Sequence, residues 1–184
     1  MLYTRAGDNG TTRTFGCGQR ISKSSKIAEA LGTLDETNSF LGVCKVESEK
    51  EKLFFQSEVS FATILEKAQG NLFIVQAELA GSKMSITPEK IIEMEAIIDG
   101  VEKELPPIKS FFISGGTKLA ALFDYARTIS RRAERRVVEA SEEGKTEVGE
   151  NTLAYLNRLS SLLYVLARLT NHKFGITESG PTYK

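Results

Sequence analysis

The sequence contains little of the residue types that build metal centres and disulfide frameworks. Its 184 residues include one histidine, two cysteines and no tryptophan. Cys17 and Cys44 are far apart and lack the paired spacing of a zinc site or a small disulfide scaffold. The single histidine, His172, falls near the expected end of a helix, where such residues usually satisfy terminal carbonyl groups or face solvent. No catalytic triad can be assembled from this set, and a reducing cytoplasm is the expected location.

An excess of charge of either sign is also missing, and so are long hydrophobic runs. The 24 basic and 24 acidic residues cancel, so no global field favours nucleic acid or an anionic membrane as a partner. No segment approaches the roughly 18 consecutive apolar residues of a membrane span, and residues 1–8 lack the apolar run of a signal peptide. We therefore expect a protein that is neither exported nor inserted into a membrane. Any anion site must come from local clustering of cations.

Apolar residues recur at helical spacing through most of the chain. The expected helices cover residues 26–47, 54–81, 88–103, 117–143 and 153–172. Gly70 is a possible break in the second helix, Thr87 and Pro88 form a helix start, and Gly144 is a C-cap. No strand pair is convincing. The sequence predicts an all-α fold, a five-helix up-down bundle in a single domain of residues 1–184.

A segment rich in glycine, threonine and serine precedes the bundle. Residues 1–25 form an extended N-terminal arm, residues 26–172 the bundle, and residues 173–184 a tail. The arm can place backbone N–H groups and hydroxyls on phosphate oxygens without obstruction by side chains. It lacks the spacing of a Walker loop, and no strand precedes it. A disordered tail is the alternative interpretation of this composition.

Five arginines fall within ten residues of the fourth expected helix. Arg127 and Arg131 share one face with Glu134 or Arg135, whereas Arg132 and Arg136 lie on a neighbouring stripe. Guanidinium groups crowded on one face repel each other and need an anion, either a carboxylate or a phosphate chain. A solvated face laced by ion pairs is the alternative, and a nucleic-acid-binding helix is a weaker one.

Polar residues also interrupt two apolar helices. Asp35 and Asn38 lie one turn apart, and Asp35 could supply the carboxylate that an arginine needs, from the same or another subunit. A solvated helix face is the alternative. Asn157 and Arg158 interrupt the leucine-rich last helix, where a buried amide must find a ligand or a hydrogen bond in the core.

Taken together, five segments of the chain closely resemble the propanediol-utilisation type of ATP:cob(I)alamin adenosyltransferase in order and spacing. The five segments are residues 4–12, 32–36, 111–116, 127–136 and 155–160. The resemblance implies a homotrimer of five-helix bundles, with ATP bound between neighbouring subunits, the arm folded over the nucleotide, and the corrinoid beside it.

The resemblance also implies roles for individual residues. Asp35 and Arg127 match an acid–base pair that joins subunits at the site, and Phe111 matches an aromatic residue that covers the lower face of the corrin and excludes its axial ligand. Arg131 is expected both to bind ATP and to act in catalysis. The other residues expected around the nucleotide are Thr4, Arg5, Gly7, Asp8, Gly10, Thr11, Thr12, Lys23, Glu134, Arg135 and Asn157.

The sequence departs from the family pattern at three positions. Ser114 stands where proline is frequent, Leu31 where an aromatic residue is frequent, and Arg13 where glycine is common. The serine could loosen the loop that carries Phe111. None of the three changes removes a residue expected to touch ATP, so they bear on corrinoid affinity more than on activity.

The implied reaction transfers the 5′-deoxyadenosyl group of ATP to cob(I)alamin and releases triphosphate. Co(I) is itself the nucleophile, which fits the missing catalytic triad. Arg131, Arg135, Lys23 and a Mg²⁺ ion would stabilise the leaving triphosphate. The product could be delivered to an adenosylcobalamin-dependent enzyme. The alternatives are a non-catalytic carrier of nucleotide or corrinoid and a structural helix bundle.

Overall fold

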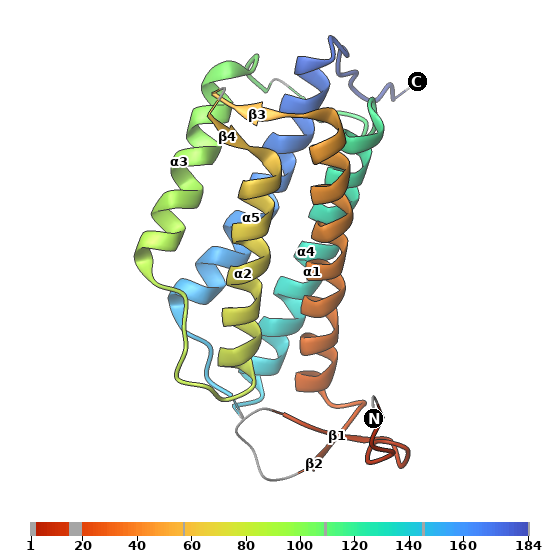
Figure 1. The fold of residues 1–184 in the computed structure, drawn as a ribbon, viewed down its shortest axis with the longest axis vertical. Coiled ribbons are helices and arrows are strands. Elements are labelled where there is room, and N and C mark those ends of the chain that lie inside the picture. The colour runs from red at the N-terminus through yellow and green to blue at the C-terminus, as the bar shows by residue number, and fades with distance from the viewer. Residues whose placement is uncertain (1–2, 15–19, 57, 109, 145, 184) are drawn as a thin grey trace.

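The computed structural model describes residues 3–14, 20–56, 58–108, 110–144 and 146–183. In this part of the chain, five helices run along a common axis and an arm extends from one end (Figure 1). The helices are α1 (Lys26–Glu51), α2 (Phe61–Leu79), α3 (Pro88–Glu104), α4 (Lys118–Glu142) and α5 (Glu150–Lys173). The all-α prediction is confirmed.

The core lies between helices that pack in pairs. α1 packs against α2 and α4, and α5 packs against α3 and α4. α5 is the most deeply buried helix, because leucines such as Leu159, Leu163 and Leu166 are fully enclosed. Burial of this apolar surface is the main term that stabilises the bundle. None of the helices in the described ranges is both long and apolar enough to cross a membrane.

Ion pairs along the α1–α4 contact show that the two helices are antiparallel. Lys26 at the start of α1 pairs with Glu139 and Glu143 at the end of α4, at 3.5 and 3.2 Å. Lys118 at the start of α4 pairs with Glu47 near the end of α1, at 3.0 Å. Each of these exposed pairs contributes little to stability. All of them agree, however, with a single alignment of α4 along α1.

The prediction for the second helix is wrong at its start, and the alternative of one unbroken helix holds at Gly70. Phe54–Phe55 is not helical but forms strand β3, which pairs with β4 (Val59–Ser60) in a tight antiparallel hairpin. Gln56 has a left-handed backbone, with φ of 50°, which a helix cannot accommodate. Gly70 does not break α2, because the helix passes through it without interruption.

Side-chain caps explain most of the helix starts. Ser25, Ser60 and Thr117 accept hydrogen bonds from the free N–H groups of α1, α2 and α4. Thr87 precedes Pro88 as expected, but its hydroxyl makes no cap hydrogen bond. Gly144 follows α4 with φ of 71°, as predicted for a C-cap. α1 extends four residues beyond the predicted end, to Glu51, where Lys52 takes a left-handed conformation with φ of 50°.

The arm contains a strand pair that the sequence did not predict. β1 (Thr11–Arg13) pairs with β2 (Arg20–Ser22) in antiparallel register, with Thr12 opposite Ile21. This hairpin lies at the end of the bundle where α1 begins, whereas the C-terminal segment lies at the other end (Figure 1).

Candidate active site

The arginines of α4 divide into two stripes with different partners. Arg132 binds Glu36 of α1, and Arg136 binds Glu139 at 2.8 Å and Glu29 of α1 at 3.7 Å. On this stripe each guanidinium group has a carboxylate partner within the chain, although the buried Nε of Arg132 has no hydrogen-bond partner among the described residues. The interpretation of a solvated, ion-paired helix face therefore holds for Arg132 and Arg136.

The second stripe carries Arg127, Arg131 and Arg135. None of the three makes a side-chain hydrogen bond or an ion pair with any residue that the structure describes, and the buried Nε of Arg127 lacks a partner. A buried donor without an acceptor destabilises a protein, so an acceptor from outside this chain is expected there. Three cations on one face can bind an extended anion such as a phosphate chain.

Glu134 lies next to this stripe and is held from α5. The side-chain amide of Asn157 donates a hydrogen bond to Glu134 Oε1 at 3.0 Å. Asn157 is exposed rather than buried, so it needs no partner within the core. Its neighbour Arg158 pairs with Glu95 of α3 at 2.8 Å and so links α5 to α3 at the surface.

The polar pair of α1 is split between core and surface. Asn38 is buried, and it exchanges hydrogen bonds with Gln69 of α2, each at 3.0 Å, through side-chain amides and main-chain carbonyls. Asn38 is therefore a residue of the core. Asp35 is exposed and has no ion pair within the described part of the chain, so its carboxylate is available to a partner outside this chain.

The arm is organised by Arg20, which is not among the site residues predicted from the sequence. Its Nε donates to Thr11 Oγ1 at 2.6 Å, and its Nη2 donates to the Thr11 carbonyl at 2.8 Å and to the Ala6 carbonyl. One guanidinium group thus joins the turn before β1 to β1 itself. No local pattern could have revealed it, because the hairpin that brings Arg20 to Thr11 was not predicted.

Close packing within the arm explains one of its glycines. A Cβ atom at Gly7 would lie 3.2 Å from Nζ of Lys23 and 3.3 Å from the Thr11 carbonyl oxygen. Glycine at this position lets the lysine ammonium approach the main chain of the turn. The remaining arm residues predicted to bind nucleotide lie at the surface or half-buried around this turn: Thr4, Arg5, Asp8, Gly10 and Thr12.

Phe111 lies on the loop between α3 and α4, at the opposite end of the bundle from the arm hairpin (Figure 1). Its ring is 81% exposed, which is unusual for a phenylalanine. Singly exposed apolar side chains are common, but Ile108 and Ile113 on the same loop are also exposed. The loop therefore presents an apolar surface that could cover a ligand.

The loop ends in a glycine pair whose conformation is fixed from α5. Gly115 and Gly116 have φ of 130° and 94°. Asn171 donates to the Gly115 carbonyl at 2.9 Å and accepts from the Thr117 N–H at 3.0 Å. A Cβ atom at Gly116 would collide with the Asn171 amide. The segment was expected to be a flexible turn, but hydrogen bonds from Asn171 fix its conformation.

Asp124 of α4 contacts the same turn from the other side. Its Oδ2 accepts a hydrogen bond from the Gly115 N–H at 3.0 Å. Burial raises the pKa of Asp124, although that hydrogen bond and the charge of Arg127 act in the opposite direction. Ser114, which stands where proline is frequent in the family, also acts to lower the pKa of this carboxylate.

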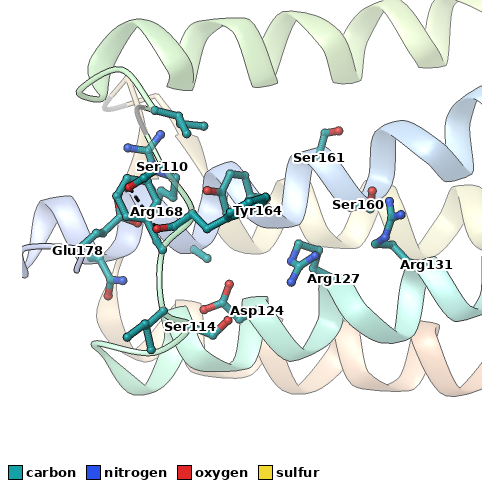
Figure 2. A pocket seen from close by; sticks show the side chains of 16 residues that line it. Ser110, Ser114, Asp124, Arg127, Arg131, Ser160, Ser161, Tyr164, Arg168 and Glu178 are labelled. Carbon is teal, nitrogen blue, oxygen red and sulfur yellow. Dashed lines mark hydrogen bonds and ion pairs between the residues drawn. The ribbon is translucent and has the colours of Figure 1, made fainter. Parts of the chain in front are cut away.

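A pocket of about 640 Å³ extends from the Phe111 loop to the arginine stripe. Figure 2 shows Arg127 and Arg131 following one another along its wall, with Ser160, Ser161 and Tyr164 of α5 nearby. The end beneath the loop holds most of the apolar side chains of the lining, together with the charged Asp124, Arg168 and Glu178, whereas the other end holds Arg127 and Arg131. Such a pocket suits a large ligand with a flat apolar part and an anionic part.

The other candidate chemical groups do not form a site. Burial raises the pKa of the Cys44 thiol to about 12, so it is not a nucleophile. Cys17 lies outside the described residues. His172 is exposed. Within the described ranges, histidine, cysteine, aspartate and glutamate form no group of three that could hold a metal ion.

Comparison with known proteins agrees with this geometry. The family model for cobalamin adenosyltransferase matches residues 2–170. The corrinoid adenosyltransferase PduO of Citrobacter freundii is 40% identical over 178 residues, which cover 93% of this chain and 50% of that protein. The corrinoid adenosyltransferase of Bacillus subtilis is 39% identical, with coverage of 95% and 89%. The chain spans about half the length of the PduO relatives it matches.

Solved structures give the same result. A variant of the PduO-type ATP:corrinoid adenosyltransferase from Lactobacillus reuteri, complexed with cobalamin and ATP, superposes with a TM-score of 0.85 and 28% identity. The match covers 100% of this chain and 97% of that chain. A second variant of that enzyme, complexed with ATP, gives a TM-score of 0.84. The chain belongs to the cobalamin adenosyltransferase family.

Proposed function

We propose that this protein transfers the 5′-deoxyadenosyl group of ATP to cob(I)alamin, giving adenosylcobalamin and triphosphate. The observation that carries the proposal is the unpaired stripe of Arg127, Arg131 and Arg135, which leads into the pocket beneath the Phe111 loop. A similar enzyme binds cobalamin and ATP together. One pocket with an apolar and a cationic end fits both substrates.

The nucleotide is assigned to the cationic end. Arg131 and Arg135 would bind the triphosphate, and the Asn157–Glu134 pair would orient the nucleoside. The arm would close over the phosphates with its hydroxyls, its N–H groups and Lys23. The arm residues in this role are Thr4, Arg5, Gly7, Asp8, Gly10, Thr11 and Thr12.

The corrinoid is assigned to the apolar end. A phenyl ring in place of an axial ligand would leave cobalt four-coordinate, which makes cobalt(II) easier to reduce. The exposure of Phe111 and its position on the border of the pocket support this role.

The reaction needs no nucleophile from the protein. Cob(I)alamin donates an electron pair to C5′ of ATP, the Co–C bond forms, and the C5′–O bond breaks with release of triphosphate. Cobalt is oxidised from Co(I) to Co(III). Negative charge grows on the leaving group, and fixed guanidinium groups stabilise it without reorganising. Alignment of C5′ with cobalt would supply much of the rate enhancement that charge stabilisation does not provide.

A Mg²⁺ ion is expected to accompany ATP and to neutralise part of the triphosphate charge. The described residues offer no cluster of three acidic or histidine ligands, so phosphate oxygens and water would provide most of the coordination. Arg131 and Arg135 would share the remaining charge with it.

We further propose that the active unit is a cytoplasmic homotrimer with sites at subunit interfaces. Neither Asp35 nor Arg127 has an ion pair with another residue that the structure describes, and the two would pair across the interface. In each chain the arm lies at the opposite end from the Phe111 loop, so an arm from a neighbour could complete the site. The unit would comprise one domain, residues 1–184, with the arm at 1–25, the bundle at 26–172 and a tail at 173–184.

The interface pair can be tested with single charge reversals in separate chains. Asp35→Arg and Arg127→Asp should each lower activity and weaken assembly in sedimentation. Co-expression of the two variants should restore both properties in part, because opposite charges then meet at two of the three interfaces of a mixed trimer. Mixed assemblies no better than either variant alone would contradict the pairing.

One anaerobic assay tests the proposed activity. Protein, ATP, Mg²⁺ and chemically reduced cobalamin should yield adenosylcobalamin, recognised by its absorption spectrum and light sensitivity, together with triphosphate. A carrier of nucleotide or corrinoid would bind both substrates without product, and could deliver its ligand to an adenosylcobalamin-dependent enzyme. A structural bundle would show no stabilisation by ATP.

A further inference from the structure

Arg168 is a buried arginine of α5. It does not belong to the stripe of Arg127, Arg131 and Arg135 on α4. Its side chain on α5 is only 4% exposed. Nε donates to Glu178 Oε2 at 2.9 Å, Nη2 donates to the Pro106 carbonyl at 3.0 Å, and the guanidinium carbon lies 5.0 Å from the centre of the Phe112 ring. Burial of a charge is costly unless it is paired and hydrogen-bonded, and here three different partners meet that need.

The partners of Arg168 belong to two segments that are distant in sequence. Pro106 and Phe112 lie on the loop that carries Phe111, whereas Glu178 lies on the segment after α5. Figure 2 shows Arg168 and Glu178 together at the end of the pocket opposite Arg131. Arg168 therefore joins the Phe111 loop, α5 and the C-terminal segment at one point.

The C-terminal segment also contacts the loop directly. The Ile113 N–H donates to the Ser179 carbonyl at 2.9 Å. A Cβ atom at Gly180 would lie 3.3 Å from Ser110 Oγ and 3.4 Å from the Phe111 carbonyl oxygen. The loop is thus enclosed between α5 and residues 178–180, while Phe111 itself stays exposed.

α5 holds both ends of the loop from neighbouring positions. Asn171 fixes the Gly115 and Thr117 end, and Arg168 fixes the Pro106 and Phe112 end. These two residues are three apart and so lie on one face of the helix. Because the Phe111 ring is 81% exposed, its own packing cannot fix its position. The backbone that Arg168 and Asn171 hold must do so.

We infer that Arg168 is a positioning residue, which, with Glu178, sets the place of the Phe111 ring over the bound corrinoid. The inference rests on the proposed function. Arg168 acts through the loop and takes no part in binding ATP. The charge of Glu178 matters because it neutralises Arg168 in a poorly solvated setting, so loss of Glu178 would leave a buried cation without its counter-ion.

Two mild substitutions test this role in the full-length protein. Arg168→Lys keeps the charge but cannot reach the carboxylate and the carbonyl with one planar fork, and Glu178→Gln keeps an acceptor oxygen but removes the charge. Both should lower kcat/KM for cob(I)alamin by about 10- to 100-fold through displacement of the ring. KM for ATP and the thermal stabilisation by ATP should not change. Lys67→Met, which removes an exposed ion pair with Glu93 between α2 and α3, is the matched control.

A spectroscopic readout separates positioning from general destabilisation. With ATP and cob(II)alamin, the wild-type protein should show the absorption of four-coordinate cobalt(II), and both variants should show less of it at saturating corrinoid. Unchanged spectra and kinetics in Glu178→Gln would overturn the inference, as would equal losses for ATP and corrinoid. If Arg168→Lys does not fold, Glu178→Gln alone decides. A wild-type protein without activity would instead refute the proposed function.

Discussion

Asn157 of α5 and Glu134 of α4 are joined by a hydrogen bond of 3.0 Å beside the unpaired arginine stripe. The bond orients the carboxylate toward α5. Since Arg131 and Arg135 on the same helix have no ion pair among the described residues, Glu134 does not neutralise them. The positive charge of the stripe is therefore available to bind an anionic ligand.

The arginines of the two stripes on α4 should differ in their effect on activity. Arg131→Ala should reduce kcat/KM by an amount equivalent to about 2–4 kcal/mol, because a fixed cation opposite the leaving triphosphate is lost. The melting temperature should hardly change. Arg136→Ala, which removes paired charges of the neighbouring stripe, is the control and should retain most of the activity. Near-normal turnover of the Arg131 variant in the anaerobic assay would reject its role.

Phe111→Ala should affect the corrinoid but not the binding of ATP. The ring borders the apolar end of the pocket and is far from the arm, so ATP affinity should be unchanged. Formation of four-coordinate cobalt(II) should be impaired, because water or another ligand could then reach the lower axial position. The absorption spectrum of cob(II)alamin bound with ATP measures this. An unchanged spectrum would remove Phe111 from the mechanism.

Alanine substitutions at Gly116 and Gly70 should change the free energy of unfolding in opposite directions. Gly116→Ala adds a Cβ atom that collides with the Asn171 amide, at a residue with φ of 94°. It should lower the free energy of unfolding by about 1–3 kcal/mol. Gly70→Ala adds a Cβ atom in open space on an exposed face of α2, and it should raise stability by about 0.5–1 kcal/mol. Urea unfolding followed by circular dichroism compares them, and equal effects would contradict the described turn.

Asp124 should make stability depend on pH. Burial raises its pKa in the folded state, so the folded protein holds this proton more tightly than the unfolded chain. The associated stability is present below the ordinary pKa of aspartate and is lost as the pH rises through the raised value. Asp124→Asn keeps an acceptor for the Gly115 N–H and should melt at a higher temperature than wild type at pH 7. The difference should shrink near pH 4. Asp99→Asn, at an exposed position of α3, is the control.

The periodicity of apolar residues was sufficient to predict the helices but not the hairpins. Five helices were predicted, and four of their starts lie within about three residues of the observed ones, because the apolar repeat begins close to where each of these helices begins. Phe54 was misassigned because two aromatic residues fit a helix as well as a two-residue strand. The bend at Gln56 that decides the matter has no sequence signal.

The candidate site was predicted more completely on α4 than elsewhere. Helical geometry alone separates Arg127 and Arg131 from Arg132 and Arg136, and the structure pairs only the latter two. Arg20 and Arg168 were missed because their partners lie far away in sequence or in segments without periodic structure. Asn157 was expected to be buried, since the helix around it is rich in leucine, but its side chain lies on the outer face.

The exposed ring of Phe111 has a thermodynamic consequence. In the free protein, the ring and its neighbours Ile108 and Ile113 keep apolar area in contact with water. A flat macrocycle that covers them would return that water to the bulk. Calorimetry at several temperatures should therefore give a negative heat-capacity change for corrinoid binding, and a smaller one when the phenyl ring is replaced by a methyl group.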